Sequence, residues 1–158
     1  MEQAAQNIDW LALSGRLKEW QQHHRGWLAE LKRCRSLDDI ADYPAYYRLI
    51  QGHIPAGRVA QRSAFILPWL PHRASAKPIG ESFKNARISE MRLFQMMRSE
   101  SPKDIELLRR LIQQAEPSVD WQKFGSTIYY WGKRSKREIV EQYFLSESTK
   151  PQTEGATP

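Results

Sequence analysis

A cluster of positive charge near the carboxyl end is the part of this sequence best suited to binding a charged ligand. Lys133, Arg134, Lys136 and Arg137 place four cations in five positions, directly after Gly132. Closely spaced cations suit phosphate groups, because each cation can neutralise one phosphate and release its counterions. The alternative is a charged turn that only faces solvent, and the spacing alone leaves both interpretations open.

The residues before this cluster predict a helix that fixes its position. Asp120 is a suitable N-cap for a helix that begins at Trp121. Four large apolar residues then fall within an arc of about 80° on the helical wheel, and we expect all four to be buried. They are Trp121, Phe124, Ile128 and Trp131. Such an arc would anchor the basic cluster on the core.

The cluster itself is predicted to lie at the junction of two helices. We expect Gly132 to end the first helix, since glycine is common after a helix C-terminus. Ser135 and Glu138 have the spacing of a capping box and predict the start of a last helix. Tyr129 and Tyr130 precede the junction, where they suit either stacking on unpaired bases or a contact between helices.

The distribution of charge also indicates a polyanionic partner. The chain of 158 residues has a formal net charge of +6. Residues 58–137 alone carry 16 cations and 7 anions, whereas the cations and anions of residues 1–57 balance. A concentrated positive excess of this kind is most often found in proteins that bind nucleic acid.

Helical signals recur along the whole chain, and alternating strand patterns are absent. Asp9 and Ser89 are suitable N-caps, and Ser101 followed by Pro102 predicts a further helix start. We therefore expect an all-α protein with a single compact domain of about eight helices over residues 1–147. The polar residues 148–158 are predicted to form a disordered tail, and residues 71–80 a mobile loop.

The helix predicted after Ser101 carries three basic residues with different expected positions. Lys103 and Arg110 lie opposite its apolar arc, and Arg109 lies on the flank of that arc. We also expect Arg110 to share one outer surface with Lys133 and Arg134.

The location of the protein is predicted from two further features. The longest apolar run, residues 64–70, is too short to span a bilayer. The first ten residues lack the basic and apolar regions of a signal peptide. We expect a cytoplasmic protein with no membrane partner.

The residue types required for catalysis do not form a recognisable constellation. A single cysteine, Cys34, excludes an internal disulfide and a cysteine-based metal site. The four histidines lack the spacing of a helical metal site. Asp38, Asp39 and Asp42 fall at a predicted helix start, where carboxylates favour the helix dipole. The sequence thus predicts no enzyme, no catalytic residue, no metal and no cofactor.

Four stretches of the sequence, taken together, resemble a known family. They are DYPAYYRLIQ (42–51), ARISEMRLFQMMR (86–98), DIELLRRLIQQAEPSVDW (104–121) and YWGKRSK (130–136). In this order and spacing they resemble the CasB family, the small subunit of the type I-E CRISPR Cascade complex. The similarity is dense from about Asp38 to Leu145. Ser101 and Tyr130 depart from the family pattern, which has a basic residue and a tryptophan there.

The resemblance implies an all-helical, non-catalytic protein that binds nucleic acid without sequence preference. Its implied partners are the CRISPR RNA, the target and displaced DNA strands, the backbone and large subunits, and a second copy of the chain. The basic residues at matching positions are the implied nucleic-acid contacts. They are Arg33, Arg58, Arg87, Arg98, Arg110, Lys133 and Arg134.

Two other classes of protein remain compatible with the residues. A free-standing helical regulator would read bases from a helix that follows a glycine turn, and the WGKRSKRE junction has a similar pattern. A helical adaptor would bind only protein. A regulator would bind its own DNA site far more tightly than random DNA, whereas a Cascade small subunit would show almost no such difference.

Overall fold

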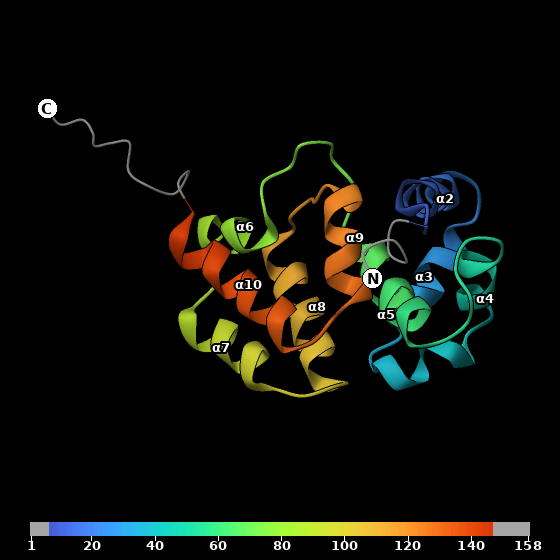
Figure 1. Cartoon of the computed structure of the whole chain (residues 1–158). Coiled ribbons are helices and arrows are strands. Elements are labelled where there is room, and N and C mark those ends of the chain that lie inside the picture. The colour runs from blue at the N-terminus through green and yellow to red at the C-terminus, as the bar shows by residue number, and fades with distance from the viewer. Residues whose placement is uncertain (1–6, 147–158) are drawn as a thin grey trace, which may run out of the picture.

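The computed structural model describes residues 7–146, which form nine α-helices and two 3-10 helices (Figure 1). In chain order these are α2 (Trp10–His23), α3 (Arg25–Arg33), η1 (Leu37–Asp42), α4 (Pro44–Ile50), α5 (Arg58–Ile66), η2 (Leu67–Trp69), α6 (Ile79–Asn85), α7 (Glu90–Arg98), α8 (Lys103–Ala115), α9 (Trp121–Tyr129) and α10 (Lys133–Leu145). No strand occurs between residues 7 and 146, so the predicted all-α class is confirmed. The predicted tail at 148–158 lies outside the described residues.

The helices gather into two groups that share one core. The helices α2 to α5 lie on one side, α6, α7, α8 and α10 lie on the other, and α9 lies between them (Figure 1). In the first group, α9 packs on α2 and α5, and in the second, α10 packs on α6 and α7. The buried apolar residues of both groups belong to a single cluster, as expected of one domain.

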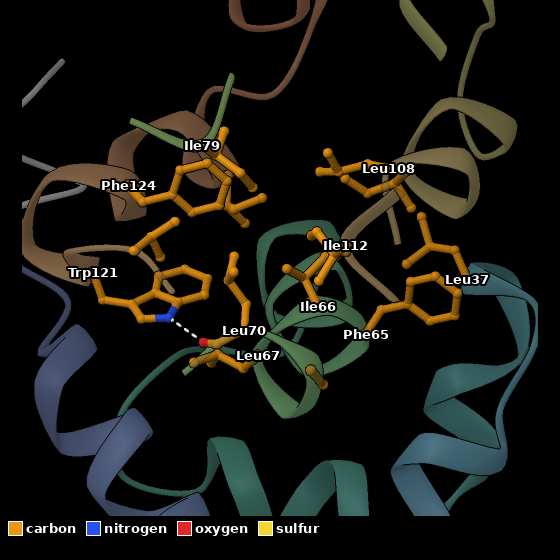
Figure 2. Packing of buried hydrophobic residues seen from close by; sticks show 14 of the residues in the cluster. Leu37, Phe65, Ile66, Leu67, Leu70, Ile79, Leu108, Ile112, Trp121 and Phe124 are labelled. Atoms are coloured by element: carbon orange, nitrogen blue, oxygen red, sulfur yellow. Dashed lines mark hydrogen bonds between the residues drawn. The ribbon is translucent and has the colours of Figure 1, made fainter. Parts of the chain in front are cut away.

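Trp121, at the start of α9, fixes this helix on the first group. Its indole is fully buried, stacks on Trp10 of α2 and meets Phe124 edge to face. Figure 2 shows its Nε1 donating a hydrogen bond of 2.7 Å to the carbonyl of Leu70. Gly125 allows the close packing of α9 on α2, because a Cβ there would overlap the Trp10 indole. Trp121, Phe124 and Ile128 are buried as predicted.

The second close approach of backbones is between α6 and α10. A Cβ on Gly80 would overlap the carbonyl of Ile139. The Gly80 N–H donates a hydrogen bond of 3.0 Å to Oε1 of Gln142. This glycine therefore permits the tight packing of the short helix α6 along the last helix.

The junction between α9 and α10 differs from the sequence prediction. The helix α9 ends at Tyr129, so Trp131 lies outside it and is only partly buried. Gly132 is instead the N-cap of α10, which begins at Lys133. Ser135 therefore lies inside the helix, where its hydroxyl donates to the carbonyl of Tyr130 at 3.0 Å. The predicted capping box is wrong because the turn between the helices spans residues 130–132, so α10 has already begun before Ser135.

Two further predictions about local structure are met in part: a helix follows Pro102 and a loop precedes α6, but their details differ. The helix α8 begins at Lys103 and has no side-chain cap, and Ser101 is exposed. Residues 71–80 are anchored near their start, because the Arg73 N–H donates to the carbonyl of Val119 at 2.8 Å and the Val119 N–H donates to the carbonyl of Pro71 at 3.1 Å. Pairing with a segment more than 40 residues away cannot be deduced from local composition.

Candidate nucleic-acid interface

The seven basic residues implied by the resemblance are all exposed. Most of them lie at helix ends: Arg33 ends α3, Arg58 begins α5, Arg98 ends α7, and Lys133 and Arg134 begin α10. The other two are Arg110 in α8 and Arg87 between α6 and α7. Their surroundings divide them into two groups and one separate residue.

The first group, which we call the η1 group, comprises Arg33, Arg58 and Arg110. Arg33 is included because the carbonyls on either side of it, those of Lys32 and Cys34, bind the neighbour of Arg110 in α8. A guanidinium nitrogen of Arg58 lies 2.8 Å from Oδ1 of Asp38 in η1, and another donates to Gln61 at 2.8 Å. Both members of the Arg58–Asp38 pair are largely exposed, with 41% and 58% of their side chains accessible. Arg58 is therefore held beside η1 but stays open to a ligand.

The helix α8 brings Arg110 to the same region. One carboxylate oxygen of Glu106 accepts hydrogen bonds from the Leu37 N–H at 2.9 Å and from the Ser36 hydroxyl at 3.2 Å. Arg110 follows Glu106 by four residues and so lies on nearly the same side of the helix. Arg110 thus lies between Glu106, which bonds to residues beside η1, and Gln114, whose amide oxygen accepts a hydrogen bond from Arg92 of α7. Its common surface with Lys133 and Arg134 stays a prediction.

The second group, which we call the α10 group, comprises Arg98, Lys133 and Arg134. The ammonium of Lys136 donates to the carbonyl of Ser99 at 2.6 Å, which places the first turns of α10 against the end of α7. Arg98 directly precedes that carbonyl, and Lys133 lies one helical turn before Lys136. The three exposed cations therefore surround one corner of the molecule.

Arg87 belongs to neither group. The carbonyl of the next residue, Ile88, accepts a hydrogen bond of 2.6 Å from the Tyr143 hydroxyl. Tyr143 lies ten residues beyond Lys133 on α10, a distance of about 15 Å along the helix. Arg87 also has a positive φ of 63° in the turn between α6 and α7.

Several other cations bind groups of the protein itself. Arg109, predicted to lie on the flank of the apolar arc of α8, is only 4% exposed. Its guanidinium donates to the carbonyls of Cys34 and Lys32, the latter at 2.7 Å, and lies 4.1 Å above the centre of the Phe65 ring. Burial lowers the pKa of Arg109 to about 10.

Lys136, counted by the sequence analysis within the basic cluster, is buried as well. Its ammonium lies 2.8 Å from Oδ2 of Asp104, and both side chains are almost inaccessible. The ion pair and the bond to the Ser99 carbonyl together satisfy this buried charge. The exposed part of the cluster is therefore Lys133, Arg134 and Arg137.

Two further arginines bind carbonyls at helix ends. Arg62 of α5 donates to the carbonyls of Ile128 and Tyr129 at 2.9 and 2.8 Å. Burial lowers its pKa from the ordinary value. Arg16 of α2 donates to three carbonyls at the end of α4 at 2.9 to 3.0 Å.

These buried and partly buried cations share one structural role. Each binds backbone carbonyls at the C-terminal end of a different helix, where carbonyls lack partners and the dipole favours positive charge. They are Arg16, Arg62, Arg109 and Lys136. The last three contribute to the charge excess of residues 58–137 but are committed to the fold.

The two tyrosines before α10 contact each other. Their rings meet edge to face with 4.7 Å between centroids, and both are partly buried. The Tyr130 hydroxyl and the Trp131 indole nitrogen are buried without a hydrogen-bond partner among the described residues. The arrangement favours a packing role for these tyrosines over the stacking of bases.

Within residues 7–146 the structure offers neither a metal site nor a membrane span. In that range no three His, Cys, Asp or Glu side chains are grouped so that they could hold a metal ion. None of its helices is both long and apolar enough to cross a membrane.

Comparison with known proteins identifies the family. Residues 27–144 match the family model described as CRISPR-associated protein Cse2. The Cascade subunit CasB of Escherichia coli K12 is 31% identical over 160 residues, which cover 90% of this chain and 96% of that protein. A chain in the crystal structure of E. coli Cascade bound to a PAM-containing double-stranded DNA target matches with a TM-score of 0.78, over 89% of this chain and 97% of that chain. The resemblance found in the sequence is thereby confirmed, and the chain belongs to the Cse2 family of CRISPR-associated proteins.

Proposed function

We propose that this chain is the small, non-catalytic subunit of a type I-E Cascade complex. In that role it holds the CRISPR RNA–target DNA heteroduplex and the displaced DNA strand through their phosphates, without reading base sequence. Its protein partners are the backbone and large subunits and a second copy of itself. The observation that carries the proposal is the similarity, over 89% of the chain, to a chain of DNA-bound E. coli Cascade.

The arrangement of exposed charge supports the role in nucleic-acid binding. Among the exposed cations, the η1 group and the α10 group form two clusters of accessible arginine and lysine. Guanidinium groups bind phosphate oxygens in a forked geometry. Two separated clusters suit an extended polyanion better than a small phosphorylated ligand.

Holding the opened DNA requires only a few contacts to phosphates. Base pairing between RNA and DNA supplies the specificity, and the exchange of one duplex for another is nearly balanced in free energy. A small number of phosphate contacts can therefore decide whether the opened DNA persists. Six contacts would give log K a slope of about −4 to −5.5 against log salt.

The proposal is tested by removing each cluster separately. One variant carries Arg33, Arg58 and Arg110 as alanine, and the other carries Arg98, Lys133 and Arg134 as alanine. We expect each to lower the affinity for random-sequence DNA and for an RNA–DNA duplex and to reduce the magnitude of the salt slope by about 2 to 3. Fluorescence anisotropy over a salt series measures both quantities.

A matched control removes the same charge elsewhere. Lys18, Arg25 and Lys123 are exposed and lie outside both clusters. Their triple alanine variant should retain most of the affinity and the slope. An equal loss in the control would show that net charge, and not these clusters, determines binding. A preference of the wild type above tenfold for one DNA sequence would favour a regulator.

A further inference from the structure

The segment that joins α3 to η1, residues 33–37, is attached to α8 at both of its ends. At its start, the buried guanidinium of Arg109 donates hydrogen bonds to the carbonyls of Lys32 and Cys34, which flank Arg33. Because both carbonyls are bound by one rigid, planar group, the backbone at the end of α3 is fixed on α8.

Glu106 of α8 provides the attachment at the other end of the segment. One of its carboxylate oxygens accepts hydrogen bonds from the Leu37 N–H at 2.9 Å and from the Ser36 hydroxyl at 3.2 Å. Within the segment, the Cys34 thiol donates to the Ser36 carbonyl at 3.1 Å. We call the hydrogen bonds that Glu106 and Arg109 make to this segment the α8 clamp.

The clamped segment directs the side chain of Arg35 to solvent. Cys34 and Ser36 have extended backbones, with ψ angles of 124° and 133°. Successive side chains of an extended chain point to opposite sides. The Cys34 side chain is buried and the Ser36 hydroxyl faces Glu106, so Arg35 points outwards between them and is exposed.

The guanidinium of Arg35 is available to a ligand, as is that of Arg33. Neither forms an ion pair, a hydrogen bond or a ring contact with another residue in the range 7–146. Asp38 and Asp39 follow Arg35 by three and four residues, the spacing at which opposite charges meet on a helix. Because the segment before η1 is extended, Arg35 is kept out of that arrangement.

We propose that Arg35 is a further phosphate contact of the nucleic-acid surface, held in place by the α8 clamp. Glu106 and Arg109 are then positioning residues, which act on nucleic acid only through the segment that they hold. A fixed backbone favours binding, because less conformational entropy is lost when the two exposed arginines of the segment meet a phosphate chain. The inference rests on the proposed function, since it takes the ligand to be the phosphates of nucleic acid.

The contact itself is tested by Arg35→Ala in the full chain. We expect the affinity for random-sequence DNA to fall about three- to tenfold at 0.1 M salt, and the magnitude of the salt slope to fall by about 0.7 to 0.9. Fluorescence anisotropy over a salt series measures both quantities. Arg25→Ala removes an exposed cation from the other end of α3 and should leave the slope nearly unchanged. A wild-type slope in Arg35→Ala, or the same loss in Arg25→Ala, would overturn the proposal.

The clamp is tested at Glu106, where the effects of charge and of position have opposite signs. Removing this carboxylate should by long-range electrostatics raise the affinity for a polyanion. We nevertheless expect Glu106→Ala to lower the affinity about three- to tenfold, because the segment loses its attachment to α8. Glu106→Gln removes the same charge but keeps an oxygen acceptor, so it should bind DNA at least as tightly as the wild type. Hydrogen exchange of residues 33–37 should be faster in Glu106→Ala than in Glu106→Gln.

Two further variants separate positioning from a general loss of structure. In a background that carries Arg33→Ala and Arg35→Ala, Glu106→Ala should have little further effect on affinity, because the clamp acts through these two cations. Ser36→Ala removes one bond of the clamp with less damage, and it should lower the affinity about two- to threefold even where Glu106→Ala does not fold. An undiminished loss in the double-alanine background, or wild-type affinity in Ser36→Ala, would overturn the positioning role.

The same binding experiment distinguishes failure of this inference from failure of the proposed function. The proposed function stands if the wild type binds DNA and the triple alanine variant of the η1 group binds it more weakly. In that case, wild-type affinity and slope in both Arg35→Ala and Glu106→Ala would overturn this inference alone. A wild type without measurable affinity for DNA would overturn both.

Discussion

Two buried cations hold this fold together in different ways. Arg109 of α8 binds the carbonyls at the end of α3, and Lys136 of α10 binds the carbonyl that follows α7. Lys136 has a carboxylate partner, Asp104, at 2.8 Å. Arg109 has no carboxylate within 4 Å among the described residues and lies over the rings of Phe65 and Trp69.

A buried charge can thus be stabilised by dipoles or by a counter-ion, and its removal has different consequences in the two cases. Removing Arg109 leaves unpaired carbonyls, which are neutral and partly recoverable by water. Removing Lys136 leaves the charge of Asp104 buried without compensation, which is more costly. Arg110 and Arg137, the exposed neighbours of these residues in sequence, provide matched controls.

The largest effect is expected for Lys136→Ala. It should lower the free energy of unfolding by about 3–5 kcal/mol, since it leaves a buried carboxylate unpaired. Urea unfolding measures this loss, and Arg137→Ala should change stability by less than about 0.5 kcal/mol. The double variant Lys136→Met with Asp104→Leu should recover much of the loss. Equal losses in the single and double variants would show that the ion pair is not the cause.

Arg109→Ala should have the second largest effect on stability. It removes two hydrogen bonds from a charged donor and the packing of the guanidinium on Phe65, so we expect a loss of about 2–3 kcal/mol. Arg110→Ala should be close to neutral in the same urea experiment. A loss as small as that of Arg110→Ala would contradict the structural role of Arg109.

The rate at which the Cys34 thiol reacts reports on the contact between Arg109 and the end of α3. Its thiol is fully buried, and burial raises its pKa, so reaction with a thiol reagent requires the end of α3 to open. Arg109 donates to the Cys34 carbonyl. Labelling should therefore be faster in Arg109→Ala than in Lys136→Ala under native conditions, although the second variant loses more stability. The reverse order would show that labelling proceeds through global unfolding.

The local features of this fold could be predicted from the sequence. The N-caps Asp9, Ser89 and Asp120 were predicted correctly, and each accepts a hydrogen bond from an N–H two or three residues ahead. Such interactions are local, so residue types and spacing suffice. The family was also found from ordered motifs in the sequence.

The roles of adjacent basic residues could not be predicted in this way. The helical wheel placed Arg109 on the flank of the apolar arc and Arg110 opposite it, in agreement with the burial of one and the exposure of the other, but it does not indicate which groups Arg109 binds. The carbonyls that bind Arg109 lie 75 and 77 residues away in sequence. The carboxylate that pairs with Lys136, that of Asp104, also lies 32 residues away. Where the partner is distant in sequence and belongs to the backbone, residue type carries no signal of it.

The smallest effect is expected at an exposed pair, Arg58 and Asp38. Both side chains are substantially accessible, so solvent screens their interaction, and Asp38→Asn should change stability by less than about 1 kcal/mol. The same change removes an anion that competes with phosphate for Arg58. It should therefore raise the affinity for random DNA by about two- to threefold at low salt, with the gain disappearing at high salt. Asp42→Asn, which neutralises an exposed carboxylate at the end of η1, serves as the control. An unchanged affinity in Asp38→Asn, or the same gain in Asp42→Asn, would show that Arg58 is not a phosphate contact, and the η1 group would then be reduced to Arg33 and Arg110.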